Sequence, residues 1–233
     1  MRRVEARFIH EFDLVSVVSG TDLEELRSLS APSGVSGARI TVASNGVSDA
    51  CFEHDGVRGP TVVFVAHLGW RPNVDAAVWL CTKVWPHVRQ LAPDLDLHLV
   101  GRSPAAAVRS LGADDIRVFA DVPSTVEHVG AARVATAPLL AAGGTRLKIL
   151  EALAVGTPVV ATSLGALGLE RLEGVSLAIE DTPELFARRI VEASRSTPPI
   201  EQTRALVEAF RWDRALASLI DGIATLARPG SKQ

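Results

Sequence analysis

Residues 137–161 constrain the fold more than any other part of the chain. In order, they predict the end of a strand, a glycine turn, a helix, a tight turn and another strand. Gly156-Thr-Pro158 ends the helix, because glycine permits a left-handed cap and proline cannot continue a helix. Val159-Val-Ala161 is then short, apolar and typical of a buried strand. A strand, a helix and a second strand in this order indicate a parallel sheet.

The glycine turn before this helix is a candidate ligand-binding site. Gly143 and Gly144 let the backbone approach a bound molecule closely, and Thr145 can cap the helix that follows. A helix N-terminus carries about half a positive charge, and its first amides have no partner within the helix. Arg146 and Lys148 add two full charges. The corner therefore suits a phosphate, while the alternative is an ordinary turn with a solvated arginine and lysine.

Glu151 follows about two turns after the glycines, behind three apolar residues of the same helix. An ionised carboxylate has two acceptor oxygens, so it can accept hydrogen bonds from both hydroxyls of a ribose. The alternative is a carboxylate that points to water.

The run from Gly143 to Ala161, Gly-Gly-Thr-Arg-x-Lys-x-x-Glu-Ala-x-Ala-x-Gly-x-Pro-Val-Val-Ala, resembles the donor-site signature of the group 1 glycosyltransferases. These are retaining enzymes of the two-domain GT-B fold that use nucleotide sugars. The resemblance implies catalytic roles for Arg146 and Lys148, which would hold the developing diphosphate charge, and donor-binding roles for the glycine turn and Glu151. Many members carry Glu-x7-Glu. Gly143 occupies the position of the first glutamate, so a sugar contact made by that carboxylate is missing here.

From residue 59 onward, strands alternate with helices. Apolar runs predict six strands, at residues 62–66, 95–100, 116–119, 134–137, 159–161 and 176–179. The helix expected at 74–90 should bury Val74, Val78, Cys81, Val84, Trp85 and Val88. Crossovers of one handedness then give an α/β fold with a doubly wound, six-stranded parallel sheet, which is the Rossmann-like half of a GT-B fold. Ligands bind at the carboxyl ends of such strands.

Four further residues at these strand ends are predicted donor contacts. Gly101 and Arg102 end the second strand. Residues 67–75 resemble the family's Leu-x-x-Arg-Pro-Asn-x-Asp turn, which would turn Arg71 toward the cleft; the alternative is a surface arginine at a helix start. Residues 120–123 resemble the family's Gly-Phe-Val-x-Asp edge near the nucleobase. Val122 is therefore a candidate base contact, with ordinary turn packing as the alternative.

Residues 1–58 are interpreted as a remnant of the acceptor domain with its hinge, and residues 59–233 as the donor-binding domain with C-terminal helices. Strands are expected at 12–19 and 40–42, and Asn45-Gly-Val47 matches the hinge of the family. Phe210 and Trp212 resemble the Phe-Ser-Trp before the family's C-terminal helix and are expected in the core. Strand 12–19 is apolar on both faces, so it must be covered. It can pair with residues 40–42 and pack against the C-terminal helix, meet the same strand of a second copy, or accept a separately encoded acceptor domain. For the isolated chain we expect self-association.

Composition excludes several classes of protein. The formal charge of −3 gives no general attraction to nucleic acid, and no apolar run approaches the roughly 20 residues of a membrane span. Two cysteines make no disulfide framework, and the N-terminus lacks a signal peptide, so a cytoplasmic protein is expected. Asp94-Leu-Asp96 lies at a strand start and the six histidines lack ligand spacing, so no metal is expected. Neither a Gly-x-Gly-x-x-Gly nor a Walker loop is present.

The sequence therefore predicts a glycosyltransferase donor domain that binds a nucleotide diphosphate sugar as substrate, with no cofactor. The resemblance implies transfer with retention and without an essential metal. The alternative is a noncatalytic nucleotide-binding or interaction module derived from such an enzyme.

Overall fold

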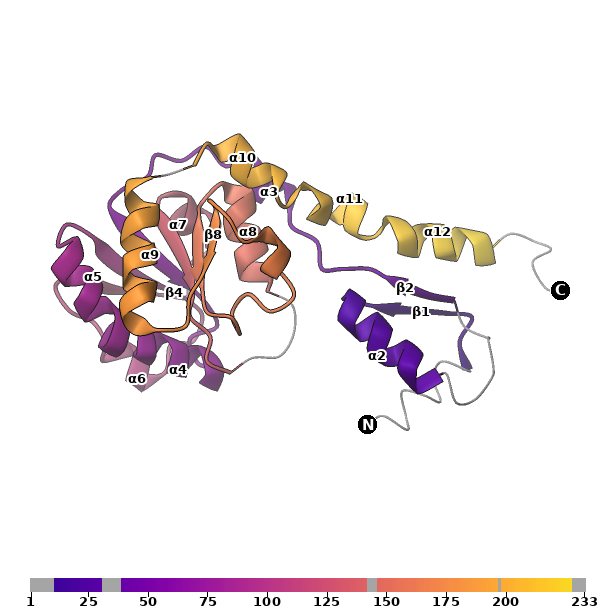
Figure 1. The fold of residues 1–233 in the computed structure, drawn as a ribbon, viewed down its shortest axis with the longest axis horizontal. Coiled ribbons are helices and arrows are strands. Elements are labelled where there is room, and N and C mark those ends of the chain that lie inside the picture. Colours follow the sequence, from indigo (N-terminus) through magenta and orange to yellow (C-terminus); the bar gives the residue numbers. More distant parts are fainter. Residues whose placement is uncertain (1–10, 31–38, 142–145, 197, 228–233) are drawn as a thin grey trace. The chain divides into compact units, whose positions relative to one another are not determined.

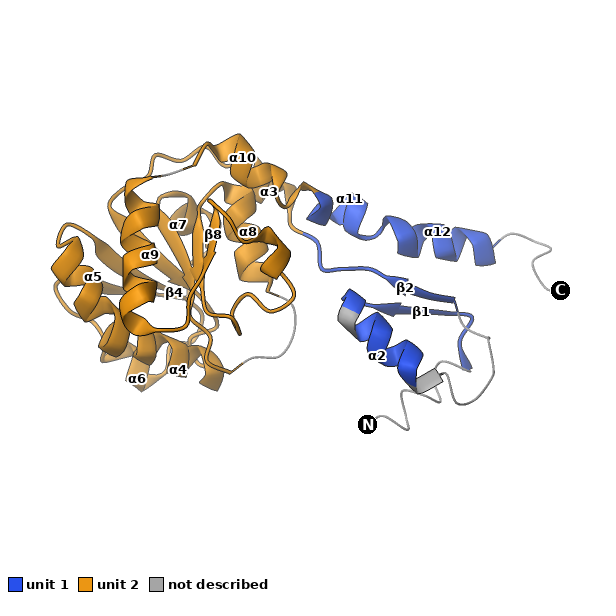
Figure 2. Ribbon diagram, viewed as in Figure 1, with its two compact units in different colours: residues 1–46, 209–233 blue, residues 47–208 orange. Residues whose placement is uncertain are grey.

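The computed structural model describes residues 11–30, 39–141, 146–196 and 198–227. The chain divides into two compact units (Figure 2). Unit 1 consists of Met1–Gly46 and Ala209–Gln233, and unit 2 consists of Val47–Glu208. The sequence analysis divides the chain at residue 58 on a different basis, by the family domain that each segment resembles. That division stays a prediction.

Unit 2 is built on six strands, all paired in parallel. They are β3 (Thr61–Val65), β4 (Asp96–Gly101), β5 (Ile116–Ala120), β6 (Val134–Ala137), β7 (Val159–Ala161) and β8 (Leu177–Ile179). Their order in the sheet is β5-β4-β3-β6-β7-β8, so the predicted doubly wound sheet is confirmed. The chain winds outward from β3 in one direction and from β6 in the other. The sheet therefore has its topological switch point between β3 and β6.

Helices cover both faces of this sheet (Figure 1). The helical elements of unit 2 are α3 (Asp49–Phe52), α4 (Arg71–Trp79), the π-helix η2 (Leu80–Val84), α5 (Trp85–Leu91), α6 (Ala106–Arg109), α7 (Val126–Gly130), α8 (Leu147–Val155), the 3-10 turn η3 (Glu170–Leu172), α9 (Pro183–Arg195) and α10 (Ile200–Ala205). Elements η2, α5 and α9 contact one another, whereas α3, α7 and α10 gather around α8.

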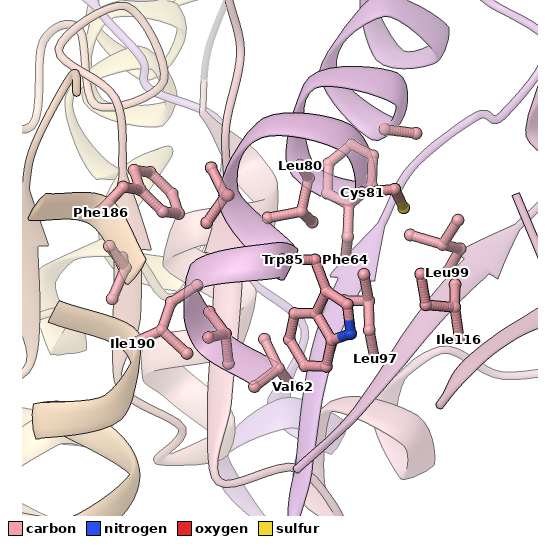
Figure 3. Packing of buried hydrophobic residues seen from close by; sticks show 14 of the residues in the cluster. Val62, Phe64, Leu80, Cys81, Trp85, Leu97, Leu99, Ile116, Phe186 and Ile190 are labelled. Atoms are coloured by element: carbon pink, nitrogen blue, oxygen red, sulfur yellow. The ribbon is translucent and has the colours of Figure 1, made fainter. Parts of the chain in front are cut away.

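The main apolar core lies between the sheet and the layer of η2, α5 and α9 (Figure 3). Phe64 and Leu97 from the sheet meet Trp85 and Ile190 from the helices, and all four are fully buried. The Trp85 indole N–H also donates to Asp115 Oδ2 at 2.9 Å, which satisfies its polar atom. Burial of this many large side chains holds the strands, and therefore their carboxyl ends, in fixed positions.

The predicted helix at 74–90 is interrupted by one wide turn. Trp85 donates its backbone N–H to the Leu80 carbonyl, five residues back, just before Pro86. Because a π-turn inserts an extra residue, it shifts the buried stripe around the helix axis. Ahead of the shift, Leu80 is fully buried and Val78 only half-buried, so the expectation for Val78 is wrong.

Unit 1 contains a small parallel sheet with helices. Its elements are β1 (Leu14–Val17), α2 (Gly20–Ser30), β2 (Arg39–Val42), α11 (Trp212–Ala215) and α12 (Ala217–Leu226), and η4 (Glu208–Phe210) joins it to unit 2. Both α2 and α12 contact the two strands. Phe210 is buried as expected, but Trp212 is 46% exposed. A Cβ on Gly46 would lie 2.3 Å from the indole, so Trp212 covers the Gly46 backbone with one ring face instead of filling a core.

Among the helices of the described ranges, none has the length and apolar character that crossing a membrane requires.

Candidate functional site

The candidate site lies beside the switch point of unit 2, where the chain leaves β3 and β6. The segment after β3 leads into α4, and the segment after β6 leads into α8. Gly143, Gly144 and Thr145 lie outside the described residues, so their predicted roles stay predictions. The charged residues that follow them are described and can be placed.

Helix α8 holds the charged residues in fixed positions. The Ile149 N–H donates to the Arg146 carbonyl at 2.9 Å, which starts the helix one residue after Arg146. Gly156 ends it with a φ of 93°, a conformation that favours glycine. Lys148 and Glu151 are three residues apart and therefore share one side of the helix. The opposite side is buried against the sheet, so these two side chains cannot rotate away with the helix.

Lys148 is half-buried between two neutral groups. Its Nζ lies 4.9 Å from the centre of the Phe64 ring and 3.3 Å from Asn73 Oδ1. The pKa of Lys148 is lowered to about 8, chiefly by desolvation on burial and also by the charge of Arg146, while the charge of Glu151 opposes both. Neither Phe64 nor Asn73 carries a charge, so they hold the ammonium in place without neutralising it.

Asn73 lies in this site but is not among the residues that the sequence predicted for it. Its side chain is 5% exposed, and its amide nitrogen donates to the His67 carbonyl at 3.0 Å, which turns Oδ1 toward Lys148. The sequence signal for Asn73 is the Arg-Pro-Asn turn, which contains both Arg71 and Asn73. The Arg71 side chain is 84% exposed and pairs with Asp75 at 2.8 Å. In this structure the Arg71 side chain therefore points to solvent, and its predicted role as a donor contact stays a prediction.

Arg146 and two carboxylates complete the group. Arg146 is only 4% exposed, and burial lowers the pKa of its guanidinium while the charge of Glu170 opposes this effect. Glu170 follows β7, the strand next to β6, and its Oε1 accepts the Gly168 N–H at 2.9 Å. Burial likewise raises the pKa of the half-buried Glu151, and the charge of Lys148 opposes this. The sequence offered no signal for Glu170.

The remaining predicted donor contacts follow β4 and β5. Gly101 has a φ of 151°, and a Cβ there would lie 1.7 Å from the Ala66 carbonyl oxygen, so packing against β3 already requires glycine. Arg102 is exposed, and its carbonyl accepts the Leu68 N–H at 2.9 Å. Val122 is half-buried. Their roles as donor contacts stay predictions.

Two aspartates lock the neighbouring loops in the same way. Asp121 Oδ1 accepts the backbone N–H of Ser103 at 2.9 Å, which links the loops after β5 and β4. Asp181 Oδ1 accepts the backbone N–H of Ser163 at 2.8 Å, which links the loops after β8 and β7. Ser103 and Asp121 also have positive φ angles, 49° and 53°. Strained, cross-linked loops of this kind give a binding edge a fixed shape.

A doubly wound parallel sheet with Arg146 and Lys148 beside its switch point defines a Rossmann-like α/β domain with a positively charged edge. The model of the family described as "Glycosyl transferases group 1" matches residues 59–196, and the chain belongs to this family. Its fold is the Rossmann-like part of the GT-B glycosyltransferases.

Individual proteins resemble the chain more distantly. An "Uncharacterized 44.6 kDa protein in cps region" of Klebsiella pneumoniae is 28% identical over an alignment of 146 residues, and the match covers 58% of this chain and 37% of the relative. Sucrose-phosphate synthase from Thermosynechococcus elongatus superposes with a TM-score of 0.72 at 20% identity, over 97% of this chain and 61% of that one. Pneumococcal O-GlcNAc transferase GtfA, in complex with UDP and GlcNAc, superposes with a TM-score of 0.72 at 13% identity, over 97% of this chain and 47% of that one.

Anabaena HepE in complex with UDP gives a TM-score of 0.71 at 16% identity, over 96% of this chain and 67% of that one. At these identities the structural likeness shows the fold alone. The chain spans between 37% and 67% of the length of these four proteins.

Proposed function

We propose that this chain binds the nucleotide diphosphate sugar of a glycosyltransferase reaction, in which the glycosyl group passes to an acceptor with retention of anomeric configuration. Membership of the family supports glycosyl transfer, and the site supports the donor. The observation that carries the proposal is the Lys148 ammonium, held beside the start of α8 by the neutral groups of Asn73 and Phe64.

The donor diphosphate binds at the start of α8 in this proposal. Lys148, Arg146 and the first amides of the helix face the phosphate oxygens, where negative charge develops as the sugar leaves. Charges that are already in position stabilise such a transition state without reorganising, and they do so best where water is excluded. The protein supplies these charges itself, so the proposed reaction needs no divalent metal.

The rest of the donor is assigned to the neighbouring residues. Glu151, one turn after Lys148, accepts the ribose hydroxyls, and Val122 lies against the base. Arg71, Gly101, Arg102 and the glycine turn at residues 143–145 complete the proposed donor contacts. UDP is the ligand named for GtfA and for HepE, so uridine nucleotides are the first probes to use.

The phosphate assignment is tested by binding UDP and uridine to wild type and to Lys148→Met. A charged hydrogen bond contributes about 1.5 to 3 kcal/mol, so the variant should bind UDP about 10 to 150 times more weakly and bind uridine unchanged. Lys83→Met is the matched control, because Lys83 is exposed. If Lys148→Met loses equal affinity for UDP and for uridine, or if Lys83→Met loses as much affinity for UDP, then Lys148 does not bind the diphosphate.

Retention is tested separately, by proton NMR of the sugar released when the chain hydrolyses a nucleotide sugar. The first anomer to appear should have the configuration of the donor. Release of the opposite anomer contradicts retention but leaves the binding assignment intact.

A further inference from the structure

The small sheet of unit 1 has two outer edges that differ in how they are covered. On the outer edge of β2, the Val42 carbonyl accepts the hydroxyl of Ser218 from α12 at 2.7 Å. Along β1, the carbonyl of Asp13, just before the strand, accepts the Arg39 N–H of β2, and the carbonyl of Val17 accepts the N–H of Ala43, the residue after β2. In a parallel strand the N–H and C=O of one residue point to the same side, and successive residues point to opposite sides.

The backbone groups of Leu14, Ser16 and Val18 therefore point away from β2. Among the residues that the structure describes, β2 is the one strand paired with β1. Natural edge strands are protected by lysine, proline or a bulge, and β1 contains neither lysine nor proline. This edge is thus well suited to accept another strand.

An apolar groove of about 380 Å³ runs beside the same edge, between β1 and α12. Leu14 forms part of its floor and faces α12, because a Cβ on Gly222 would lie 3.1 Å from the Leu14 side chain. Ser16 is two residues further along and lies on the same face. Leu219, Ile223 and Leu226 of α12 line the wall. An added strand would therefore find both backbone partners and an apolar surface.

We propose that a second copy of this chain docks here, with the two β1 strands antiparallel and a twofold axis at Ser16. This register is self-complementary: Leu14 lies opposite Val18 of the second copy, and Ser16 lies opposite itself. All the outward backbone groups of these residues then pair, in about six hydrogen bonds. The axis carries a small exposed serine, which leaves room for its copy, and Asp13 lies opposite Ser19, so no like charges meet.

The apolar surface near this edge is large enough to matter. Five large side chains that flank β1 or lie in α12 are between 43% and 55% exposed, namely Phe12, Val18, Ile220, Ile223 and Leu226. Together they expose on the order of 400 Å² per chain, about half of the roughly 800 Å² that each partner contributes to a standard interface. The paired backbone and the groove walls add to this area. A reversible dimer that depends on protein concentration is expected.

Cross-linking tests the register directly. Two residues opposite each other in a hydrogen-bonded antiparallel pair have Cα atoms about 5.5 Å apart, within the range of a disulfide. Mild oxidation of Ser16→Cys should double the mass from 24.7 kDa. The native Cys51 and Cys81 are buried and should not react. Ser110→Cys, an exposed position in unit 2, is the matched control and should remain a monomer.

Light scattering over a range of concentrations tests the dimer without a cross-link. Wild type and Ser16→Thr should dimerise, whereas Ser16→Lys should be a monomer, because it places two like charges on the axis. Ser16 is exposed, so the fold survives each change, and circular dichroism verifies this. Hydrogen exchange at Leu14, Ser16 and Val18 should slow as concentration rises.

A monomer at every concentration, or equal cross-linking of Ser16→Cys and Ser110→Cys, would overturn the proposal. Protection of the β1 amides that does not depend on concentration would show instead that the chain covers this edge itself. Loss of the dimer leaves UDP binding unchanged, so the proposed function and this interface fail independently.

Discussion

The half-buried ammonium of Lys148 makes the stability of this protein depend on pH in an unusual direction. Its pKa falls from 10.5 to about 8 in the folded chain, chiefly because burial disfavours the charge. Below pH 8 both the folded and the unfolded states are protonated. Between pH 8 and 10.5 only the unfolded state holds the proton, so stability rises with pH. Two and a half pKa units correspond to about 3 kcal/mol.

The perturbation is Lys148→Met, which keeps an unbranched side chain and removes the titration. Urea unfolding of both proteins at intervals from pH 7 to 11 gives the difference in their free energies of unfolding. This difference should grow in favour of wild type by about 3 kcal/mol between pH 8 and 10.5. The chain has no tyrosine, so fluorescence of its four tryptophans reports unfolding without interference from tyrosinate.

The two cysteines titrate in the same range, but in both proteins. Burial raises the pKa of Cys51 to about 11 and that of Cys81 to about 12. Their thiols ionise earlier in the unfolded state, so each lowers stability as the pH rises above about 9. Subtracting the variant from wild type removes this shared contribution. If the difference in free energy of unfolding stays constant from pH 7 to 10.5, the pKa of Lys148 is not lowered in the folded chain. That result would also refute the argument that Lys148 is held ready to bind a phosphate.

Further predictions concern the donor and the fold. Above pH 8, UDP affinity should fall about tenfold per pH unit in wild type and stay level in Lys148→Met, as isothermal titration would show. Asn73→Ala removes the neutral partner of Lys148 and should weaken UDP binding by about 1 kcal/mol; unchanged affinity contradicts its positioning role. Glu151→Gln should lose the preference for UDP over 2′-deoxy-UDP, and a wild type without that preference makes Glu151 structural. Gly101→Ala should lower stability by roughly 3 kcal/mol or more in denaturant, because its Cβ meets the Ala66 carbonyl; an unchanged midpoint refutes this.

Much of the fold could be predicted because its signals are local. Apolar runs such as Val62–Val65 and Val159–Ala161 lie in strands buried on both faces, and glycine at 156 ends α8 as its position indicates. The wide turn at Leu80 was not predicted. A prediction from helical periodicity assumes 3.6 residues per turn throughout, so it cannot place a wide turn. The wide turn instead depends on how α5 and α9 pack on the sheet.

The candidate site shows the same limit. Sequence spacing was enough to put Lys148 and Glu151 on one side of α8, because a helix places residues three apart together. It could not show that Arg71 turns outward to Asp75 while Asn73 turns inward to Lys148. Arg71 and Asn73 lie in one helical turn, 77 and 75 residues before Lys148 in the chain. Which of two neighbours faces the site depends on the placement of α4 against α8.

The sequence by itself determined the family, the strand and helix order, and the chemistry available at the start of α8, because each depends on residues close together in the chain. Only the tertiary structure decided which groups surround that chemistry. Asn73 and Phe64 meet Lys148 because β3 and β6, more than 70 residues apart, are neighbours at the switch point. Burial there lowers the pKa of Lys148, and burial belongs to the folded assembly of strands and helices rather than to any segment of it.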